Sequence, residues 1–270
     1  MRPFADTKSF FTIQGLYAAF TRTLEKDYYF AGQQHDWWEL VIITEGQVGV
    51  TAGTDVFRLK KGQAVIHEPM EFHRIWTEGE KEAEIVIFTF ISHSVPPYFS
   101  KVFSNADLYA AKELVQQLRI NYTTHQIALI DVDLNMGIQP QLALKALETF
   151  ILRLLSEQAN IPPLSSRSAR NYSAIVKVME DHIHENLSIA EIAALCNLGE
   201  ANLKLTFSRY AGMGVMQYFN RLKVTRAIEM IQKGASVQEA ATALGFANQN
   251  YFSTVFKRVT GKAPSSYKPE

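Results

Sequence analysis

A short segment near the carboxyl end of the chain carries polar side chains of the kind that hydrogen-bond to nucleic-acid bases. Phe252, Val255 and Phe256 are spaced by three and four residues, so they share the packed side of a helix. The opposite side presents amide, hydroxyl and lysine groups from residues 248–257. Asn and Gln can form paired hydrogen bonds with adenine, and Lys can contact phosphate. The spacing therefore predicts a helix with one packed face and one polar face.

The elements that must position this face occur twice. Residues 188–191 and 236–239 both read Ser-x-x-Glu, a capping box in which the Ser and Glu side chains satisfy free amides at a helix start. Each is followed by a short Ala-rich helix, a turn and a second helix, and Leu203 recurs 49 residues later as Phe252. The repeat predicts two helix-turn-helix units.

A longer helix is predicted between the two units, over residues 215–232. Its 18 residues would span about 27 Å, and successive major grooves on one face of a duplex lie about 34 Å apart. Two units joined in this way indicate a protein that binds double-stranded DNA and contacts its bases in two successive major grooves. The alternative is that both polar faces are ordinary solvated surfaces.

The repeat resembles the DNA-binding domain of AraC/XylS-type bacterial transcription regulators. The run from Gly245 to Lys268 carries the resemblance, with the family's Gly-Phe, Tyr-Phe, Phe-Lys and Gly-x-x-Pro-x-x-Tyr groups in order. Leu205 and Thr254 depart from the pattern, because the family often has Arg there. The residues that we expect to enter or flank two major grooves are Asn202, Lys204, Ser208 and Arg209 in the first unit, and Asn248, Gln249, Asn250, Ser253, Thr254 and Lys257 in the second.

Charge and composition divide the chain in two. Residues 166–270 hold 13 Lys and Arg against 8 Asp and Glu, whereas residues 1–165 hold 14 against 19. A modestly basic domain suits phosphate contacts. The segment 160–168 is rich in Pro and Ser, which predicts a linker there and a DNA-binding domain over 169–270.

The composition also indicates the cellular compartment of the protein and the absence of disulfides within it. The single cysteine, Cys196, excludes an internal disulfide and a multi-cysteine zinc site. The sequence has no apolar run of about 18 residues and no signal-peptide pattern at its start. We therefore expect a cytoplasmic protein without a membrane partner.

Residues 1–100 are predicted to form an antiparallel β-barrel or sandwich. Hairpin signals separate short β-branched and aromatic runs over residues 38–44, 47–52, 56–60, 63–68, 73–78 and 84–91. The spacing resembles a cupin, the sensor fold common in this family. Residues 101–159 are predicted to form a helical extension, with helices over 105–121 and 139–159. The fold class is thus α+β, followed by an all-α domain.

The second of these helices has an apolar stripe with two interpretations. The stripe consists of Leu142, Leu144, Leu147, Phe150, Ile151, Leu154 and Leu155. It could pack on the barrel and still offer a dimer seam, or it could serve wholly as intradomain core. Both interpretations stay open.

Within the predicted barrel, the pattern His35-x3-Glu39 and, more loosely, His73 resemble the cupin metal motifs. There, His and Glu side chains from neighbouring strands converge and hold an iron-type or zinc-type ion. Gln33 stands where an enzymatic cupin usually has another His. The full ligand set is therefore missing, and we expect no metal, no cofactor and no catalysis.

Two interpretations of these barrel residues remain. In one, His35 is a loop residue and His73 a hydrogen-bonded strand residue, both purely structural. In the other, they help to line a pocket for a small polar molecule such as a sugar. The residues predicted for that pocket are His35, Trp37, Trp38, Glu39, His73 and Trp76, and those interpreted as structural are His67, His93, His125, His182 and His184.

The resemblance implies a ligand-responsive transcription regulator and not an enzyme. Its implied partners are double-stranded DNA and a small-molecule effector, with a homodimer and RNA polymerase as further candidates. The resemblance suggests an activator, and the choice between activation and repression stays open. The alternative from another class is a metal-dependent cupin enzyme that carries a DNA-binding appendage.

Overall fold

The computed structural model describes residues 11–93, 95–96, 98, 100–121, 130–131, 137–157 and 161–268. The chain divides into two compact units. Unit 1 consists of Met1–Ala52 and Phe57–Pro163, and unit 2 consists of Gly53–Val56 and Leu164–Glu270. The end of the predicted second helix and the start of the predicted linker fall on residues 158–160, and His125 falls on residues 122–129. All of these lie outside the described residues.

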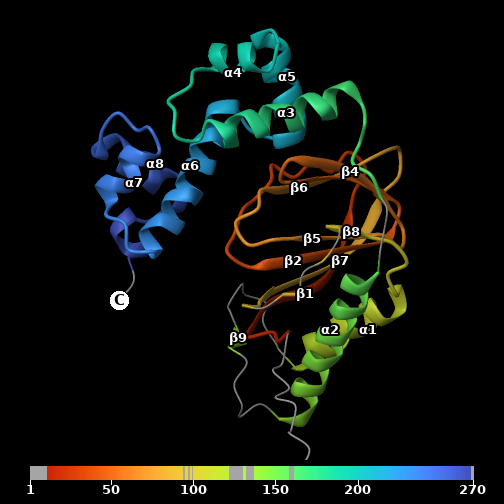
Figure 1. The fold of residues 1–270 in the computed structure, drawn as a ribbon. Helices are drawn as coiled ribbons and strands as arrows, with labels where there is room; N and C mark the ends of the chain where they lie inside the picture. Colours follow the sequence, from red (N-terminus) through yellow and green to blue (C-terminus); the bar gives the residue numbers. More distant parts are fainter. Residues whose placement is uncertain are drawn as a thin grey trace, which may run out of the picture. The chain divides into compact units, whose positions relative to one another are not determined.

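Unit 1 is built on two β-sheets (Figure 1). The six-stranded sheet has the order β8-β5-β2-β7-β1-β9, and the three-stranded sheet has the order β4-β3-β6. The strands are β1 (Gly15–Leu24), β2 (Trp38–Glu45), β3 (Gln47–Ala52), β4 (Asp55–Lys60), β5 (Ala64–His67), β6 (His73–Thr77), β7 (Ala83–Ile91), β8 (Val102–Phe103) and β9 (Ile130–Asp131). The predicted strands match β2 to β7 to within one residue at each end, which confirms the antiparallel β-fold. β1 has no counterpart among the predicted strands, and neither have the short strands β8 and β9, which lie in the segment predicted as a helical extension.

The alternation of side chains along β2 separates two cores. Val41 and Ile43 belong to the core between the two sheets. Leu40 and Ile42 belong to a second core, which lies between the larger sheet and the helices of unit 1. A strand buried on both faces reads as a continuous apolar run, as residues 40–43 do.

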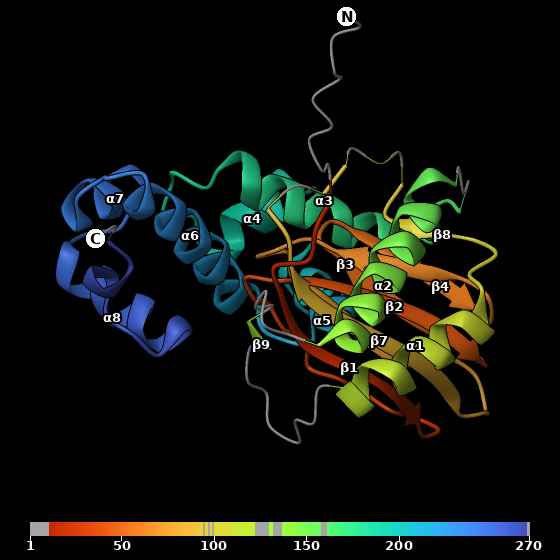
Figure 2. The ribbon, with the colours of Figure 1, turned by 90° about the horizontal axis from the view of Figure 1, so that it is seen from below.

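Two helices cover the outer face of the larger sheet. Figures 1 and 2 show α1 (Leu108–Asn121) and α2 (Ile138–Ser156) side by side along this sheet. The apolar stripe of α2 is almost wholly intradomain core, because six of its seven members are buried, namely Leu144, Leu147, Phe150, Ile151, Leu154 and Leu155. Leu142 is 57% exposed.

Unit 2 is all-α and contains the two predicted helix-turn-helix units, one on either side of a connecting helix (Figure 2). Its elements are α3 (Arg167–Asp181), α4 (Ile189–Leu195), α5 (Glu200–Ala211), the connecting helix α6 (Val215–Gln232), α7 (Val237–Ala243), α8 (Gln249–Thr260) and the 3-10 helix η1 (Pro264–Tyr267). Both capping boxes form as predicted, with Ser188 and Glu191 at α4 and Ser236 and Glu239 at α7. In the part of the chain that the structure describes, no helix is long and apolar enough to cross a membrane.

Candidate functional site

The second helix of the second unit, α8, separates its apolar and polar sides completely. Asn248 caps the helix by accepting a hydrogen bond from the amide of Tyr251 at 2.8 Å. Phe252, Val255 and Phe256 are buried. Of the residues predicted to contact DNA, Asn248, Gln249, Asn250, Thr254 and Lys257 are exposed and Ser253 is half-buried. The structure therefore brings these six side chains to one solvent-facing surface, which we call the α8 face.

The equivalent helix of the first unit, α5, has a similar division but a different surface. Leu203, Thr206 and Phe207 are buried. The four residues predicted to contact DNA are all exposed, namely Asn202, Lys204, Ser208 and Arg209. We call this surface the α5 face. Leu205 lies among them and is 67% exposed.

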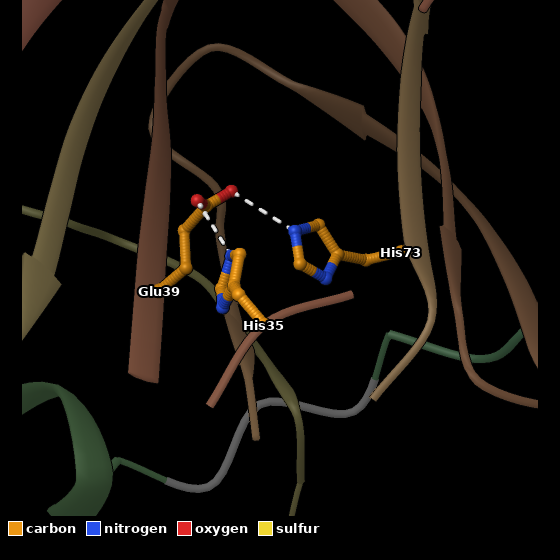
Figure 3. Close-up of side chains that lie close together, drawn as sticks. All are labelled: His35, Glu39 and His73. Carbon is orange, nitrogen blue, oxygen red and sulfur yellow. Dashed lines mark ion pairs between the residues drawn. The ribbon is translucent and has the colours of Figure 1, made fainter. Parts of the chain in front are cut away.

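The barrel carries a different kind of site, in which polar side chains converge in the interior. Glu39 lies on β2, His73 on β6 and His35 in the loop before β2. The Nε2 atom of His35 lies 3.4 Å from one carboxylate oxygen of Glu39, and the Nε2 atom of His73 lies 3.5 Å from the other. Figure 3 shows each imidazole pointing a ring nitrogen at the carboxylate. The three side chains are 7%, 4% and 9% exposed for His35, His73 and Glu39.

Neighbouring groups hold the two imidazoles in place. The Nδ1 atom of His35 lies 3.0 Å from the Trp37 carbonyl oxygen, and that of His73 lies 3.0 Å from the Glu71 carbonyl oxygen. The Trp37 ring stacks on His35 with centroids 4.5 Å apart. Gln33 directs its amide group at the cluster, 3.3 Å from Glu39 and 3.0 Å from Nε2 of His73.

The charge state of Glu39 follows from these contacts. Burial works to raise the pKa of the Glu39 carboxyl. The imidazoles of His35 and His73 outweigh burial and hold that pKa well below its usual range. Glu39 is therefore a carboxylate at neutral pH, and the barrel interior contains a fixed negative charge.

Part of this cluster lines a cavity of about 290 Å³ inside unit 1. Its polar lining residues are Gln33, Glu39, His67, His73, Arg22, Arg74 and Tyr28, and His35 is not among them. The apolar lining residues are Phe20, Leu24, Phe30, Val41, Val50, Val65, Ile75, Ile85 and Ile87. Such a site suits a small ligand that has both apolar and polar groups.

Two protein-family models match the chain, one over the barrel and one over the helix-turn-helix units. Residues 19–105 match the family described as the AraC-like ligand binding domain, and residues 192–269 match the family described as a helix-turn-helix domain. The chain carries both domains of an AraC-type regulator. The family resemblance predicted from the sequence is thereby confirmed.

Relatives of this AraC-type chain match it over part of their length. The MmsAB operon regulatory protein of Pseudomonas aeruginosa is 31% identical over 91 residues, which are 33% of this chain and 30% of that protein. The transcriptional activator RhaS of Escherichia coli is 24% identical over 152 residues, 54% of this chain and 55% of its own length. The matched part thus spans between 30% and 55% of these curated relatives.

Among solved structures, ToxT of Vibrio cholerae with a bound unsaturated fatty acid aligns with the AraC-type chain over 95% of both chains. The sequence identity is 15% and the TM-score 0.38.

The three tryptophans predicted for the effector pocket of the AraC-type chain lie in different places. Trp37 supports His35 by stacking. Trp38 packs against the core under α1 and α2, and its indole donates a hydrogen bond to the Ser92 carbonyl at 3.2 Å. Trp76 lies opposite Gly49 in the smaller sheet.

Sequence reasoning about this AraC-type chain missed His67, which was interpreted as structural. It lies opposite Glu39 in the β2–β5 pairing and stacks on His73, with ring centroids 4.3 Å apart. Burial, and then the coulombic effect of His73, lower the pKa of His67. The signal that could have found it is the register of β5 against β2.

Proposed function

We propose that the chain is a sequence-specific, DNA-binding transcription regulator whose barrel senses a small molecule. The observation that carries the proposal is the repeated polar face on the second helix of each helix-turn-helix unit. A DNA reader places this helix in the major groove, with its side chains toward base edges. The α8 face offers three carboxamides, from Asn248, Gln249 and Asn250, and a lysine, which are groups that read adenine and contact phosphate.

The cavity of unit 1 supports the sensing part of the proposal. At about 290 Å³ it lies just below the range of roughly 300–1,000 Å³ for ligand pockets. Its apolar walls, together with Arg22, Arg74 and the groups around Glu39, favour a small effector with an apolar part and more than one polar group.

DNA binding is tested with the full chain and with a fragment of residues 166–270, measured by fluorescence anisotropy on mixed-sequence duplexes. We expect the fragment to fold by circular dichroism and both proteins to bind. The logarithm of affinity should fall linearly with the logarithm of salt concentration, because binding releases counterions from the phosphates. An unfolded fragment would contradict the domain boundary at the linker, and a full chain that fails to bind at low salt would contradict the function.

Sensing is tested by thermal shift of the full chain with a library of small metabolites, followed by the change in DNA affinity that a stabilising compound produces. Coupling between two sites is typically about 1–3 kcal/mol, or 5- to 150-fold in affinity. Glu39→Gln should abolish this response and leave the DNA binding of the 166–270 fragment unchanged. A response retained in Glu39→Gln would place the effector elsewhere. Homodimer formation and contact with RNA polymerase stay predictions.

A further inference from the structure

The imidazoles of His35 and His73 both direct Nε2 at Glu39. In each ring, Nδ1 lies 3.0 Å from a backbone carbonyl oxygen. A carbonyl only accepts hydrogen bonds, so Nδ1 carries a proton and Nε2 is the ring nitrogen that a metal ion could bind. Two ring nitrogens and a carboxylate therefore lie close together (Figure 3).

Hydrogen bonds do not account for this convergence. A charge-assisted bond between an imidazolium and a carboxylate would be about 2.7–2.9 Å long, whereas the two contacts measure 3.4 Å and 3.5 Å. Nε2 of His35 is buried and has no hydrogen-bond partner among the described residues. The Gln33 amide reaches Glu39 and Nε2 of His73, whereas Nε2 of His35 has no such partner in the described part of the chain. A cation among the three groups would satisfy all of them in this buried setting.

The spacing matches the requirements of a divalent ion. With metal–ligand bonds of about 2.0–2.2 Å, two ligand atoms of a tetrahedral site lie about 3.4 Å apart. The two contacts with Glu39, 3.4 Å and 3.5 Å, are close to this value, but they reach different oxygens of its carboxylate. One ligand atom from each residue lies within 4.8 Å of the other two, so the side chains would close in slightly to bind one ion. A half-turn of the Gln33 amide would exchange its nitrogen for its oxygen and add a fourth, neutral donor.

The surroundings have the form of an outer ligand shell. Histidine ligands commonly donate their second ring N–H to a carbonyl or carboxylate, which fixes the tautomer and the ring orientation. Both rings have such a carbonyl, and each also stacks on a neighbouring ring, Trp37 on His35 and His67 on His73. These contacts orient the Nε2 atoms toward Glu39.

We propose that His35, Glu39 and His73 form a divalent metal site of the zinc or iron type, with Gln33 as the fourth donor. Nitrogen and carboxylate ligands without cysteine suit these ions. The proposal replaces the expectation of no metal. That expectation treated Gln33 as a lost ligand, although the other three side chains converge without it. It goes beyond the proposed function and stands on the barrel alone, because DNA binding does not depend on it.

The test uses the full chain, stripped with a chelator and titrated with Co²⁺, which reports its ligands through visible absorption. We expect one Co²⁺ per chain, displaced by Zn²⁺. Glu39→Gln and His73→Asn should each weaken binding by more than about 100-fold, since even outer-shell partners contribute about 10- to 100-fold. His93→Gln is the matched control, because it removes an exposed histidine of the same unit and should leave Co²⁺ affinity unchanged.

Circular dichroism of the metal-free variants checks that they fold, and a gain-of-function variant keeps the test decisive if they do not. Gln33→His supplies a stronger fourth ligand and should raise the affinity for Co²⁺ at least tenfold. Absence of stoichiometric Co²⁺ uptake by the wild-type chain would overturn the proposal. Equal uptake by Glu39→Gln, His73→Asn and His93→Gln would also overturn it, and an unchanged affinity in Gln33→His would remove Gln33 from the site. DNA binding measured in parallel separates these outcomes from a failure of the proposed function.

Discussion

The two helix-turn-helix units share their fold but not their polar surfaces. Each begins with a capping box and each second helix ends at a left-handed glycine, Gly212 or Gly261. The outward positions differ. On α5, Lys204 pairs with Glu200 at 3.2 Å, and the side-chain oxygen Oδ1 of Asn202 accepts a hydrogen bond from the Thr206 hydroxyl at 3.1 Å.

The 49-residue offset shows what changed between the two surfaces. It places Leu205 of the α5 face at the position of Thr254 on the α8 face. It also places Ala201 at the position that corresponds to Asn250 in the second unit. The two units share the caps and the packed apolar faces that determine their fold. The side chains that could hydrogen-bond to bases are more numerous on the α8 face than on the α5 face. We therefore expect the α8 face to dominate base recognition and the α5 face to contribute mainly affinity.

The turns of the two units also differ in the residue that adopts the left-handed conformation and in the contacts around it. The first turn uses Asn197 at φ 53° and the second uses Gly245 at φ 68°. A Cβ on Gly245 would lie 2.4 Å from the His184 carbonyl oxygen. Lys223 of α6 donates hydrogen bonds to the carbonyls of Glu185 at 2.6 Å and Leu244 at 2.8 Å, which ties this turn to the loop after α3.

The largest effect is expected from Gly245→Ala. The substitution combines a left-handed backbone with a close contact to a carbonyl, and together these should lower the free energy of unfolding by about 2–5 kcal/mol. Gly261→Ala is the control, because its φ is 77° but no atom lies within 4 Å of the added carbon. Chemical denaturation of both variants measures the difference. Equal losses in the two would show that the second turn is not tightly packed.

The next effect is expected from Lys223→Met, which leaves two carbonyl groups without their donor. It should lower the free energy of unfolding by about 1–3 kcal/mol. Lys233→Met removes an exposed lysine at the end of the same helix and should change stability by no more than about 0.5 kcal/mol. A loss in Lys223→Met no larger than that in Lys233→Met would mean that the link between turn and loop has no energetic role.

Lys223 also predicts a pH dependence. Burial lowers its pKa from 10.5 to about 8 in the folded chain. Unfolding therefore takes up a proton between about pH 8 and 10.5, so the free energy of unfolding should rise with pH across this window. Below pH 8 the group is protonated in both states and adds no slope. Subtracting the profile of Lys223→Met isolates the contribution, and a difference that falls with pH would contradict it.

The last predictions compare the two polar faces through their effects on DNA binding, with stability unchanged. Asn250→Ala should change sequence preference by about 1–3 kcal/mol at the affected base pair. Lys257→Ala should weaken binding to all sequences and reduce the salt slope by about 1. Asn202→Ala is the matched variant on α5 and should change preference less. Competition binding with specific and random duplexes distinguishes these patterns, and equal losses on both DNAs for all three variants would remove the distinction between the faces.

The sequence predicted helices and hairpins well because caps and turns are local signals. It missed β1, whose residues 15–19 read Gly-Leu-Tyr-Ala-Ala and include no β-branched residue. That strand is specified by its long pairing with β7, from Gly15 opposite Ile91 to Leu24 opposite Ala83. Such pairing joins residues far apart in the chain, so no local pattern reveals it.

The candidate site in the barrel was predicted only in part, because some of its contacts also join residues that are far apart in the chain. His35, Glu39 and His73 could be found from their types and spacing. Trp38 was grouped with Glu39, although neighbouring residues of a strand point to opposite faces. His67 depends on the register of β5 against β2, and the Lys223 link depends on tertiary packing. Side-chain direction along one strand is predictable from the sequence, but the contacts between strands and helices are not.

The most direct measurement is selection of DNA from a random duplex pool by the full chain, followed by sequencing of the bound fraction. We expect an enriched site with two parts whose centres are about 10–10.5 base pairs apart, with a strong preference in the part read by the α8 face and a weaker one in the part read by the α5 face. Repeating the selection with Asn250→Ala should relax the preference in one part and leave the other unchanged. A bound pool that shows no sequence enrichment, at a salt concentration where the chain binds DNA, would contradict the claim that the two units read sequence.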